Sequence, residues 1–483
     1  MDQLKRTDRV TEWKSIYITT IMAFCTNIQY NLIFPTMWPF LKIVDKDATE
    51  QFFGSCFAVY SVTACLSSPL FGYWSNKVKQ IHPPMYAGLA SMITGNVLYL
   101  STELFPSHRR YVVLTACSFL GAGSGNSALL RTYASTSCLS TDRALAMAYL
   151  NTGISVAVVL GPGLQVLLTL LGYPGLMIVC LSINNFTAAA CAALLVNIFC
   201  GLLLTFYFNE SYAEIVEDDN KDIRLPLYDN VAVGVCNLTF FTEQIFFANF
   251  DLTGASFALT VFAFTNQEAV KYGSIAQTSL GVVAFLTFIT YIRFKLVNLI
   301  RHRLVIIFAL VLLLIYLMVT YPWFFIPGRL TTFTNEDLKN ATSELVGCNT
   351  DKFTWCESMK PVNPWIYYCA SIFCIGLAIP YIDNCNNTIY GQVLGPRRQG
   401  TMQGLYQVSG GVAQILGPLV IGALYTNYGP KKVWILEMVV LAVTASMWIA
   451  FNKRMVELNC DNDENACLIT EPLIVSTLES DGL

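Results

Sequence analysis

The sequence predicts an all-α membrane protein whose twelve transmembrane helices form two six-helix halves. Of its 483 residues, 54% are hydrophobic and 13% are charged, which is about half the charged fraction of an ordinary soluble domain. Long apolar runs recur from one end of the chain to the other, and a short motif occurs once in each half. So little polar surface cannot cover soluble domains of this size, and the lipid bilayer is therefore the expected solvent.

Twelve apolar runs are long enough to cross a bilayer, which takes about 20 residues per helix. The first half, residues 16–208, holds six of them: 16–41, 52–74, 84–103, 110–131, 144–172 and 182–208. The second half, residues 229–451, holds six more: 229–250, 271–292, 303–326, 365–394, 401–425 and 432–451. Residues 251–270 are also apolar and either extend the seventh span or form a broken helix.

Basic residues predict the orientation of the spans. Residues 1–15 carry four Lys and Arg residues before the first apolar run, and no small-residue cleavage site follows that run, so we expect a retained signal anchor. With a cytoplasmic N-terminus, 17 Lys and Arg residues fall on the cytoplasmic side and 11 outside, four of them in the long loop 327–362. Positive charge favours the cytoplasmic side. We therefore place the linker 209–228 and the tail 452–483 in the cytoplasm, and the long loop outside it.

An internal repeat relates the two halves. Arg143–Met147 precedes Gly161-Pro162-Gly163, and Arg398–Met402 precedes Gly417-Pro418-Leu419. The copies are offset by 255 residues at the methionines and by 256 at the first glycines. Parallel duplication of a six-helix unit is the plan of major facilitator transporters, so we predict the fold of that superfamily.

Composition and spacing argue against several classes of function. A net charge of −3 with no basic stripe gives no reason to expect nucleic acid as a partner. Most of the 16 cysteines lie in apolar runs, where a thiol acts as a small hydrophobe, and none has metal-ligand spacing, so we expect no metal and no other cofactor. The three histidines lie at span ends without a nucleophile, and we do not expect an enzyme.

Glycine and proline mark helices that pack closely or bend. Gly161 and Pro162 in the fifth span, and Gly417 and Pro418 in the eleventh, allow close helix approach and remove backbone donors. This pattern resembles the glycine-proline motif of major facilitator antiporters. Two interpretations stay open, packing alone and a rocking surface between the halves.

The loop after the second span resembles the cytoplasmic gating loop of the same superfamily. Its sequence runs from Gly72 to Lys79 and lacks the aspartate usual near Ser75. A charge-relay latch is therefore weaker or differently made, and Asn76, Lys77 and Lys79 are the candidates to hold helix C-terminal carbonyls.

Ionisable residues at membrane depth are costly and are functional candidates by default. Arg131 suits either a snorkelling role or contact with an anion, and Glu243 suits either proton or cation handling or a satisfied polar position in the core. Glu437 is expected to face a neighbouring helix. Polar clusters occur in the first and tenth spans. The predicted transport path consists of Asn27, Asn31, Arg131, Glu243, Asp383, Asn386 and Asn387.

The long loop and the tail carry processing and sorting signals. Asn340 begins a glycosylation sequon, and Cys348 and Cys356 are expected to pair in an oxidising lumen. In the tail, Glu464, Leu468 and Ile469 have the form of an acidic dileucine signal, which predicts clathrin adaptors as partners.

Several motifs together resemble the ceroid-lipofuscinosis neuronal protein 7 family. They are Ser68 to Asn76, Gly121 to Asn126 followed by Arg131-Thr-Tyr133, Leu394-Gly395-Pro396, and Ile415 to Pro418. The resemblance implies residence in late endosomes and lysosomes and chloride permeation in support of lysosomal ion balance. Because Glu243 and Asp383 argue against a purely anionic path, an alternative is proton-coupled, alternating-access transport of a small organic solute. A membrane scaffold or receptor that transports nothing is a third hypothesis.

Overall fold

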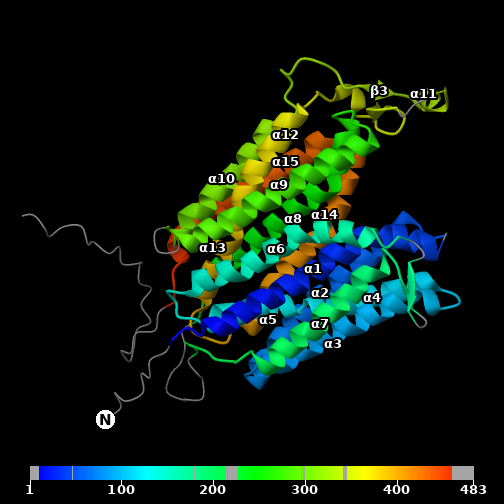
Figure 1. Cartoon of the computed structure of the whole chain (residues 1–483). Helices are drawn as coiled ribbons and strands as arrows, with labels where there is room; N and C mark the ends of the chain where they lie inside the picture. The colour runs from blue at the N-terminus through cyan, green and yellow to red at the C-terminus, as the bar shows by residue number, and fades with distance from the viewer. Residues whose placement is uncertain are drawn as a thin grey trace, which may run out of the picture.

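The computed structural model describes residues 10–45, 47–172, 175–178, 181–213, 215, 227–294, 296, 300–340 and 345–458. Most of these residues are helical, and the helices form two bundles that lie against each other (Figure 1). The first bundle consists of α1 (Trp13–Val44), α2 (Glu50–Val78), α3 (His82–Leu100), α4 (Arg109–Ser124), α5 (Asn126–Thr136), α6 (Arg143–Thr169) and α7 (Thr187–Phe206). The second consists of α8 (Asn230–Thr260), α9 (Asn266–Arg293), α10 (His302–Thr320), α12 (Pro364–Ala370), α13 (Gly376–Leu394), α14 (Gly400–Tyr428) and α15 (Pro430–Ala450).

Ten helical stretches in the described part of the chain are long and apolar enough to cross a membrane. Helices α1 and α3, of 32 and 19 residues, pack among them. Two of the expected spans are broken. The fourth consists of α4 and α5, which meet at Gly125, and the tenth consists of α12 and α13 joined by a π-helical turn at Ser371–Ile375. π-Turns of this kind are frequent at functional sites.

Side-chain caps fix where several helices of the second bundle begin. The Asp229 side chain accepts hydrogen bonds from the backbone of Val231 and Ala232 at the start of α8. Thr265 and Glu268 form a reciprocal capping box at the start of α9, which satisfies backbone donors that a helix start leaves free. Residues 251–260 therefore continue the seventh span, and residues 266–270 already belong to the eighth.

Glycine packing is equivalent in the two bundles, as the internal repeat predicts. A side-chain carbon at Gly161 of α6 would collide with Asn31 of α1. At Gly417 of α14 it would lie 2.8 Å from Ala248 of α8. Pro162 and Pro418 fall inside α6 and α14. Gly161 and Gly417 thus bring the fifth and eleventh spans against the first helix of their own half, and neither contact lies between the halves.

The closest contact between the bundles is made by α2 and α14. The backbone of Gly72 meets that of Gly400 with no room for a side chain on either residue, and Gly404 packs in the same way against Pro69. These contacts lie at the end of the bundle where the described chain begins and ends, which we call the tail end. Figure 1 shows the two bundles diverging from there toward the opposite end, which carries β3 and α11 and which we call the loop end.

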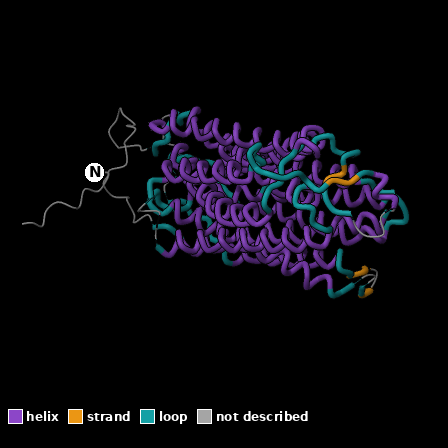
Figure 2. The backbone as a smooth tube through the Cα atoms, turned by 90° about the horizontal axis from the view of Figure 1, so that it is seen from above, coloured by secondary structure: helices purple, strands orange, loops and turns teal. Residues whose placement is uncertain are grey.

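The short strands all lie at the loop end (Figure 2). β1 (Leu176–Ile178) and β2 (Leu181–Ile183) form an antiparallel pair, and β3 (Thr332–Phe333) and β4 (Cys348–Asn349) form a parallel pair. The second pair and α11 (Asn335–Asn340) give the loop 327–362 a structure of its own. An all-α prediction does not anticipate these strands, which are too short to alter the fold class.

Candidate functional site

Arg131 reaches from the first bundle into the second. It lies on α5, is 8% exposed, and its guanidinium carbon lies 5.1 Å from the ring centre of Phe240 on α8 and 5.7 Å from that of Tyr406 on α14. The two rings stack on each other with centres 4.4 Å apart. Neither Nε nor Nη1 of Arg131 has a hydrogen-bond partner among the described residues. The aromatic pair therefore holds the guanidinium by cation–π attraction and leaves its donors free.

Two carboxylates from the second bundle share this environment. Glu243 lies on α8, three residues after Phe240, and interacts electrostatically with both Asp383 of α13 and Arg131. Arg131 also acts on Asp383. Glu243 is 2% exposed, and neither of its carboxyl oxygens has a hydrogen-bond partner among the described residues. Oδ1 of Asp383 has no partner among them either. The three groups form one charged cluster that carries a net charge of −1 when all are ionised.

Buried amides surround the charged cluster. Asn386 donates to the Tyr406 hydroxyl at 2.8 Å and to the carbonyl oxygen of Cys236 at 3.0 Å, so it fixes the aromatic pair. Two other side-chain amides of α13 and α14 are fully buried and have no partner for either polar atom among the described residues: Asn387 and Gln403. Buried polar atoms are nearly always paired in folded proteins. Their concentration here indicates a place that water, an ion or a substrate fills.

The predicted residues of the first span bond differently. Asn27 donates to the Ala23 carbonyl and Asn31 to the Asn27 carbonyl, each one turn back along α1. Gln29, between them, accepts hydrogen bonds from Asn96 and Asn197 and joins three helices of the first bundle. The structure therefore brings together Arg131, Glu243 and Asp383, and joins Asn386 to them through Tyr406. Asn387 lies on the same helix as Asp383, whereas the side chains of Asn27 and Asn31 donate to carbonyls of their own helix.

The residues that hold Arg131 were not among those predicted from the sequence. Phe240 and Tyr406 are aromatic residues in apolar runs, and nothing in the sequence separates them from aromatic residues that face lipid. Gln403 carried a usable signal, since an amide within an apolar run of a span is itself unusual.

At the tail end, hydrogen bonds join the two bundles and close the contact between them. The Asn76 amide donates to the Thr401 hydroxyl at 2.9 Å and its oxygen accepts from the Gly400 backbone at 3.0 Å. Arg398 donates to the Lys79 carbonyl at 2.9 Å. Asn76 thus bonds across to the other half, the carbonyl at the end of α2 is held by Arg398, and Lys77 is exposed. This corrects the expectation that Asn76 and Lys77 hold these carbonyls.

Helix α5 links this closure to the charged cluster. Ser135, one turn after Arg131, donates to the Gln399 side chain at 2.7 Å. The Arg143 side chain of α6 in turn donates to the Ser135 carbonyl. Gln399 also donates to the carbonyls of Gly391 and Gly395 in the second half. The helix that carries Arg131 is therefore bonded directly to the second half at the tail end.

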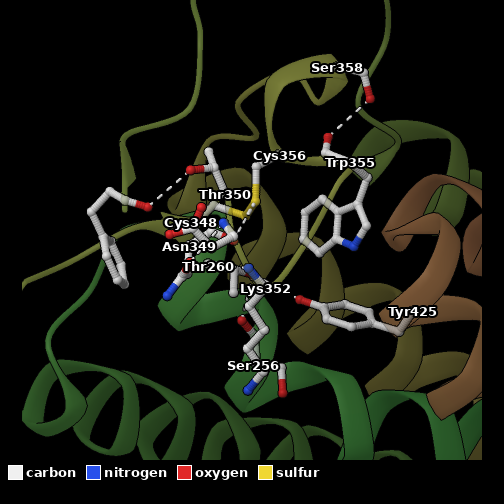
Figure 3. The surroundings of a disulfide bond; sticks show 12 residues. Ser256, Thr260, Cys348, Asn349, Thr350, Lys352, Trp355, Cys356, Ser358 and Tyr425 are labelled. Atoms are coloured by element: carbon white, nitrogen blue, oxygen red, sulfur yellow. Dashed lines mark hydrogen bonds between the residues drawn. A yellow bond between two sulfur atoms is a disulfide. The ribbon is translucent and has the colours of Figure 1, made fainter. Parts of the chain in front are cut away.

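Figure 3 shows the loop end, where Cys348 and Cys356 form a disulfide bond with Cα atoms 5.9 Å apart. Trp355, next to this disulfide, packs against Tyr425 of α14, whose hydroxyl pairs with that of Thr260 on α8 at 2.8 Å. The loop is thereby held to the second bundle. Asn340 ends α11, but its side chain lies outside the described residues. Glu464, Leu468 and Ile469 also lie outside them.

Comparison with known proteins gives one family. The family model described as Major Facilitator Superfamily matches residues 19–334 and 353–462. The chain is 26% identical over 480 residues to the major facilitator superfamily domain-containing protein 8 of Xenopus laevis, with 92% of each chain covered.

Solved structures share the fold at low identity. The human organic anion transporter MFSD10 (TETRAN) has a TM-score of 0.65 at 14% identity, covering 90% of this chain and 99% of that one. A bacterial homologue of the iron transporter ferroportin in an outward-facing state has a TM-score of 0.62 at 9% identity, with the same coverage.

Proposed function

The chain belongs to the major facilitator superfamily and is a multi-pass membrane protein of a transport family, and we propose that it moves a small anion, chloride, across endolysosomal membranes between its two halves. The fold class expected from the sequence and the resemblance to the ceroid-lipofuscinosis neuronal protein 7 family are confirmed. Chloride and the endolysosomal location follow from that resemblance. They are therefore part of the proposal.

The observation that carries the proposal is the set of free donors on Arg131. Its guanidinium is buried at the contact between the halves, is held by two aromatic rings, and keeps Nε and Nη1 without partners. A cation with unused N–H donors in a low-dielectric place is a binding site for an anion. The buried amides of Asn387 and Gln403 supply further N–H donors that suit an anion without adding charge.

The neighbouring carboxylates connect anion binding to protons. An anion at Arg131 is repelled by Glu243 and Asp383 whenever these are ionised, because all of them lie in one charged cluster. Protonation from an acidic lumen removes the repulsion. We therefore expect protons and anion to bind together, with the carboxylates as proton carriers and Arg131 as the anion site.

Alternating access supplies the route. With the basic segments in the cytoplasm, the tail end is the cytoplasmic end and the loop end faces the lumen. The Gly72–Gly400 contact and the Asn76 hydrogen bonds then form a closed cytoplasmic gate. The divergence of the bundles toward the loop end (Figure 1) suits a lumen-facing state. Rocking about the contact between α2 and α14 opens one side as it closes the other.

A second candidate, proton-coupled transport of a small organic anion, is favoured by the same two carboxylates beside Arg131. The similar human protein is called an organic anion transporter, and at 14% identity this likeness concerns the fold alone.

Recording from enlarged lysosomes separates the two candidates. Protonation of both carboxylates for each chloride bound moves one net charge per cycle, so we expect a chloride-dependent current in lysosomes that contain the wild-type chain and its loss in the Arg131→Ala variant. Proton-linked uptake of an organic anion without a chloride current assigns the second candidate instead. Unchanged fluxes of both kinds in Arg131→Ala contradict the proposal.

A further inference from the structure

A second buried carboxylate site lies inside the second bundle, apart from the charged cluster. Glu437 of α15 is 3% exposed and lines a cavity enclosed by α8, α10, α12 and α15. The centre of a molecule the size of water can occupy about 10 Å³ of this cavity. The cavity therefore has room for about one such molecule. Glu437 is therefore aimed into an enclosed space of fixed, small size.

None of the described residues that line the Glu437 cavity is basic. Neither carboxyl oxygen has a hydrogen-bond partner of good geometry among the described residues, although the Asn249 side chain approaches it. Glu437 acts electrostatically on the hydroxyls of Tyr316 on α10 and Tyr367 on α12. Whether ionised or neutral, a carboxyl group in this position lacks partners, and such a group needs an occupant in the cavity beside it.

Among the aromatic residues that line the cavity are several side chains with oxygen atoms of the kind that bind hard cations. Besides Glu437 they come from Asn249, Thr253, Tyr316 and Tyr367. The single proton of the Thr253 hydroxyl is directed to the Asn249 carbonyl at 2.8 Å or the Asn249 side-chain oxygen at 3.0 Å, so the lone pairs of the hydroxyl remain available. Carboxylate, amide and hydroxyl oxygens suit cations that prefer oxygen ligands.

We infer that the Glu437 cavity binds one small monovalent cation, of the size of sodium. A single carboxylate balances a single positive charge, and the available volume admits one body the size of a water molecule. The bound cation ties α15 to α8, α10 and α12 and so stabilises the second bundle. This site is independent of the anion path proposed above.

The test is sodium-dependent stabilisation of the purified full-length protein. Thermal unfolding is followed by tryptophan fluorescence at pH 7.5, with sodium replaced by choline at constant ionic strength and constant chloride. We expect sodium to raise the unfolding temperature in a saturable manner and potassium to do so less. The effect weakens as the pH is lowered, because protons compete with sodium for Glu437.

Variants separate this site from other carboxylates. Glu437→Gln is expected to lose the sodium-dependent shift, and Glu243→Gln, the same change in the charged cluster, to keep it. Thr253→Val preserves the shape of the side chain and removes its hydroxyl. It should raise the sodium concentration that gives half of the maximal stabilisation about tenfold, as loss of a ligand or of a group that supports a ligand does. If Glu437→Gln does not fold, two other measurements decide whether the cavity binds sodium. They are the sodium-dependent shift of Thr253→Val and the binding of radioactive sodium to the wild-type protein. Absence of a sodium-specific shift in the wild type, or its survival in the variants at Glu437 and Thr253, overturns the inference.

Discussion

Arg131 is the residue on which the account of anion binding depends, because it joins a positive charge to unused donors at the contact between the halves. We predict that Arg131→Ala weakens chloride binding about tenfold to a hundredfold, since hydrogen bonds to a charged group contribute about 1.5–3 kcal/mol. Arg131→Lys keeps the charge but loses the planar stacking on Phe240 and Tyr406, and should retain part of the affinity.

Chloride-dependent thermal stabilisation of the purified protein measures this affinity. Arg110→Ala is the control, because Arg110 lies near the start of α4, where it pairs with Asp45 at 3.6 Å. Equal chloride affinities in the wild type and in Arg131→Ala would show that Arg131 does not bind the anion.

The carboxylates predict the direction of a pH effect. Chloride flux by the wild type should rise as the pH falls, because protonation removes the negative charges of Glu243 and Asp383 from beside the anion. Glu243→Gln mimics the protonated side chain and should make the flux less dependent on pH, with its largest gain at neutral pH. Glu336→Gln, in the long loop, should keep the wild-type profile. A Glu243→Gln profile that coincides with the wild type removes protons from the mechanism.

The charged residues of the cluster could be predicted from the sequence, whereas the residues packed around them could not. Arg131, Glu243 and Asp383 could be found because charges within spans are rare. That they meet depends on the packing of α5, α8 and α13, which no local pattern encodes. Glu437 was expected to face a neighbouring helix, and the cavity beside it needed the structure.

The pairing of α2 with α14 is the element-scale feature that governs opening and closing. Gly72→Val places a side chain against the Gly400 backbone, and overpacking of this kind costs about 1–3 kcal/mol. We predict that Gly72→Val slows chloride transport about tenfold, because it disfavours closure of the tail end. Gly54→Val on the same helix is the matched control, since nothing lies within 4 Å of the position of its new side chain.

Two readouts test this prediction, the transport rate in proteoliposomes and the thermal stability of each variant. A slow Gly72→Val variant of normal stability locates the defect in the conformational change. If Gly72→Val and Gly54→Val transport at the wild-type rate, the Gly72–Gly400 contact does not gate transport.

Helix positions were predictable from apolar runs, and helix breaks were not. The expected span 303–326 corresponds to α10, which ends at Thr320, where Tyr321 adopts an extended conformation one residue before Pro322. That difference follows from the restriction that proline imposes on the residue before it. The break at Gly125 and the π-turn at Ser371–Ile375 have no counterpart in the pattern of apolar residues. An apolar run has the same appearance with or without them.

The whole molecule consists of two repeats whose backbones approach most closely at the tail end, where Gly72 meets Gly400. The start of the C-terminal tail contributes to that closure, because Glu457 lies 3.7 Å from Arg143 of the first half and the Leu458 backbone donates to Gln392 of the second. The repeat offset of about 255 residues predicted equivalent halves, and the glycine contacts of α6 and α14 agree with it. The relative tilt of the halves depends on long-range contacts and could not be read from the sequence.

Delivery of the molecule to lysosomes is predicted to depend on the tail. Leu468→Ala with Ile469→Ala should shift the protein from lysosomes to the cell surface, because adaptor recognition needs both apolar side chains. The control is Leu473→Ala with Ile474→Ala, a second Leu-Ile pair in the same tail that lacks an acidic residue four positions earlier. Imaging and surface biotinylation measure the distribution. Unchanged lysosomal delivery of the first double variant would falsify the sorting signal.

The central claim is that an anion crosses between the two halves at Arg131, and chloride flux into proteoliposomes tests it most directly. The purified full-length wild type, Arg131→Ala and Arg110→Ala are reconstituted at equal density, and chloride and proton uptake are followed together under an imposed pH gradient. The account predicts chloride uptake accompanied by protons in the wild type and in Arg110→Ala, and a reduction of at least about tenfold in Arg131→Ala. Chloride uptake by Arg131→Ala at the wild-type rate would contradict it.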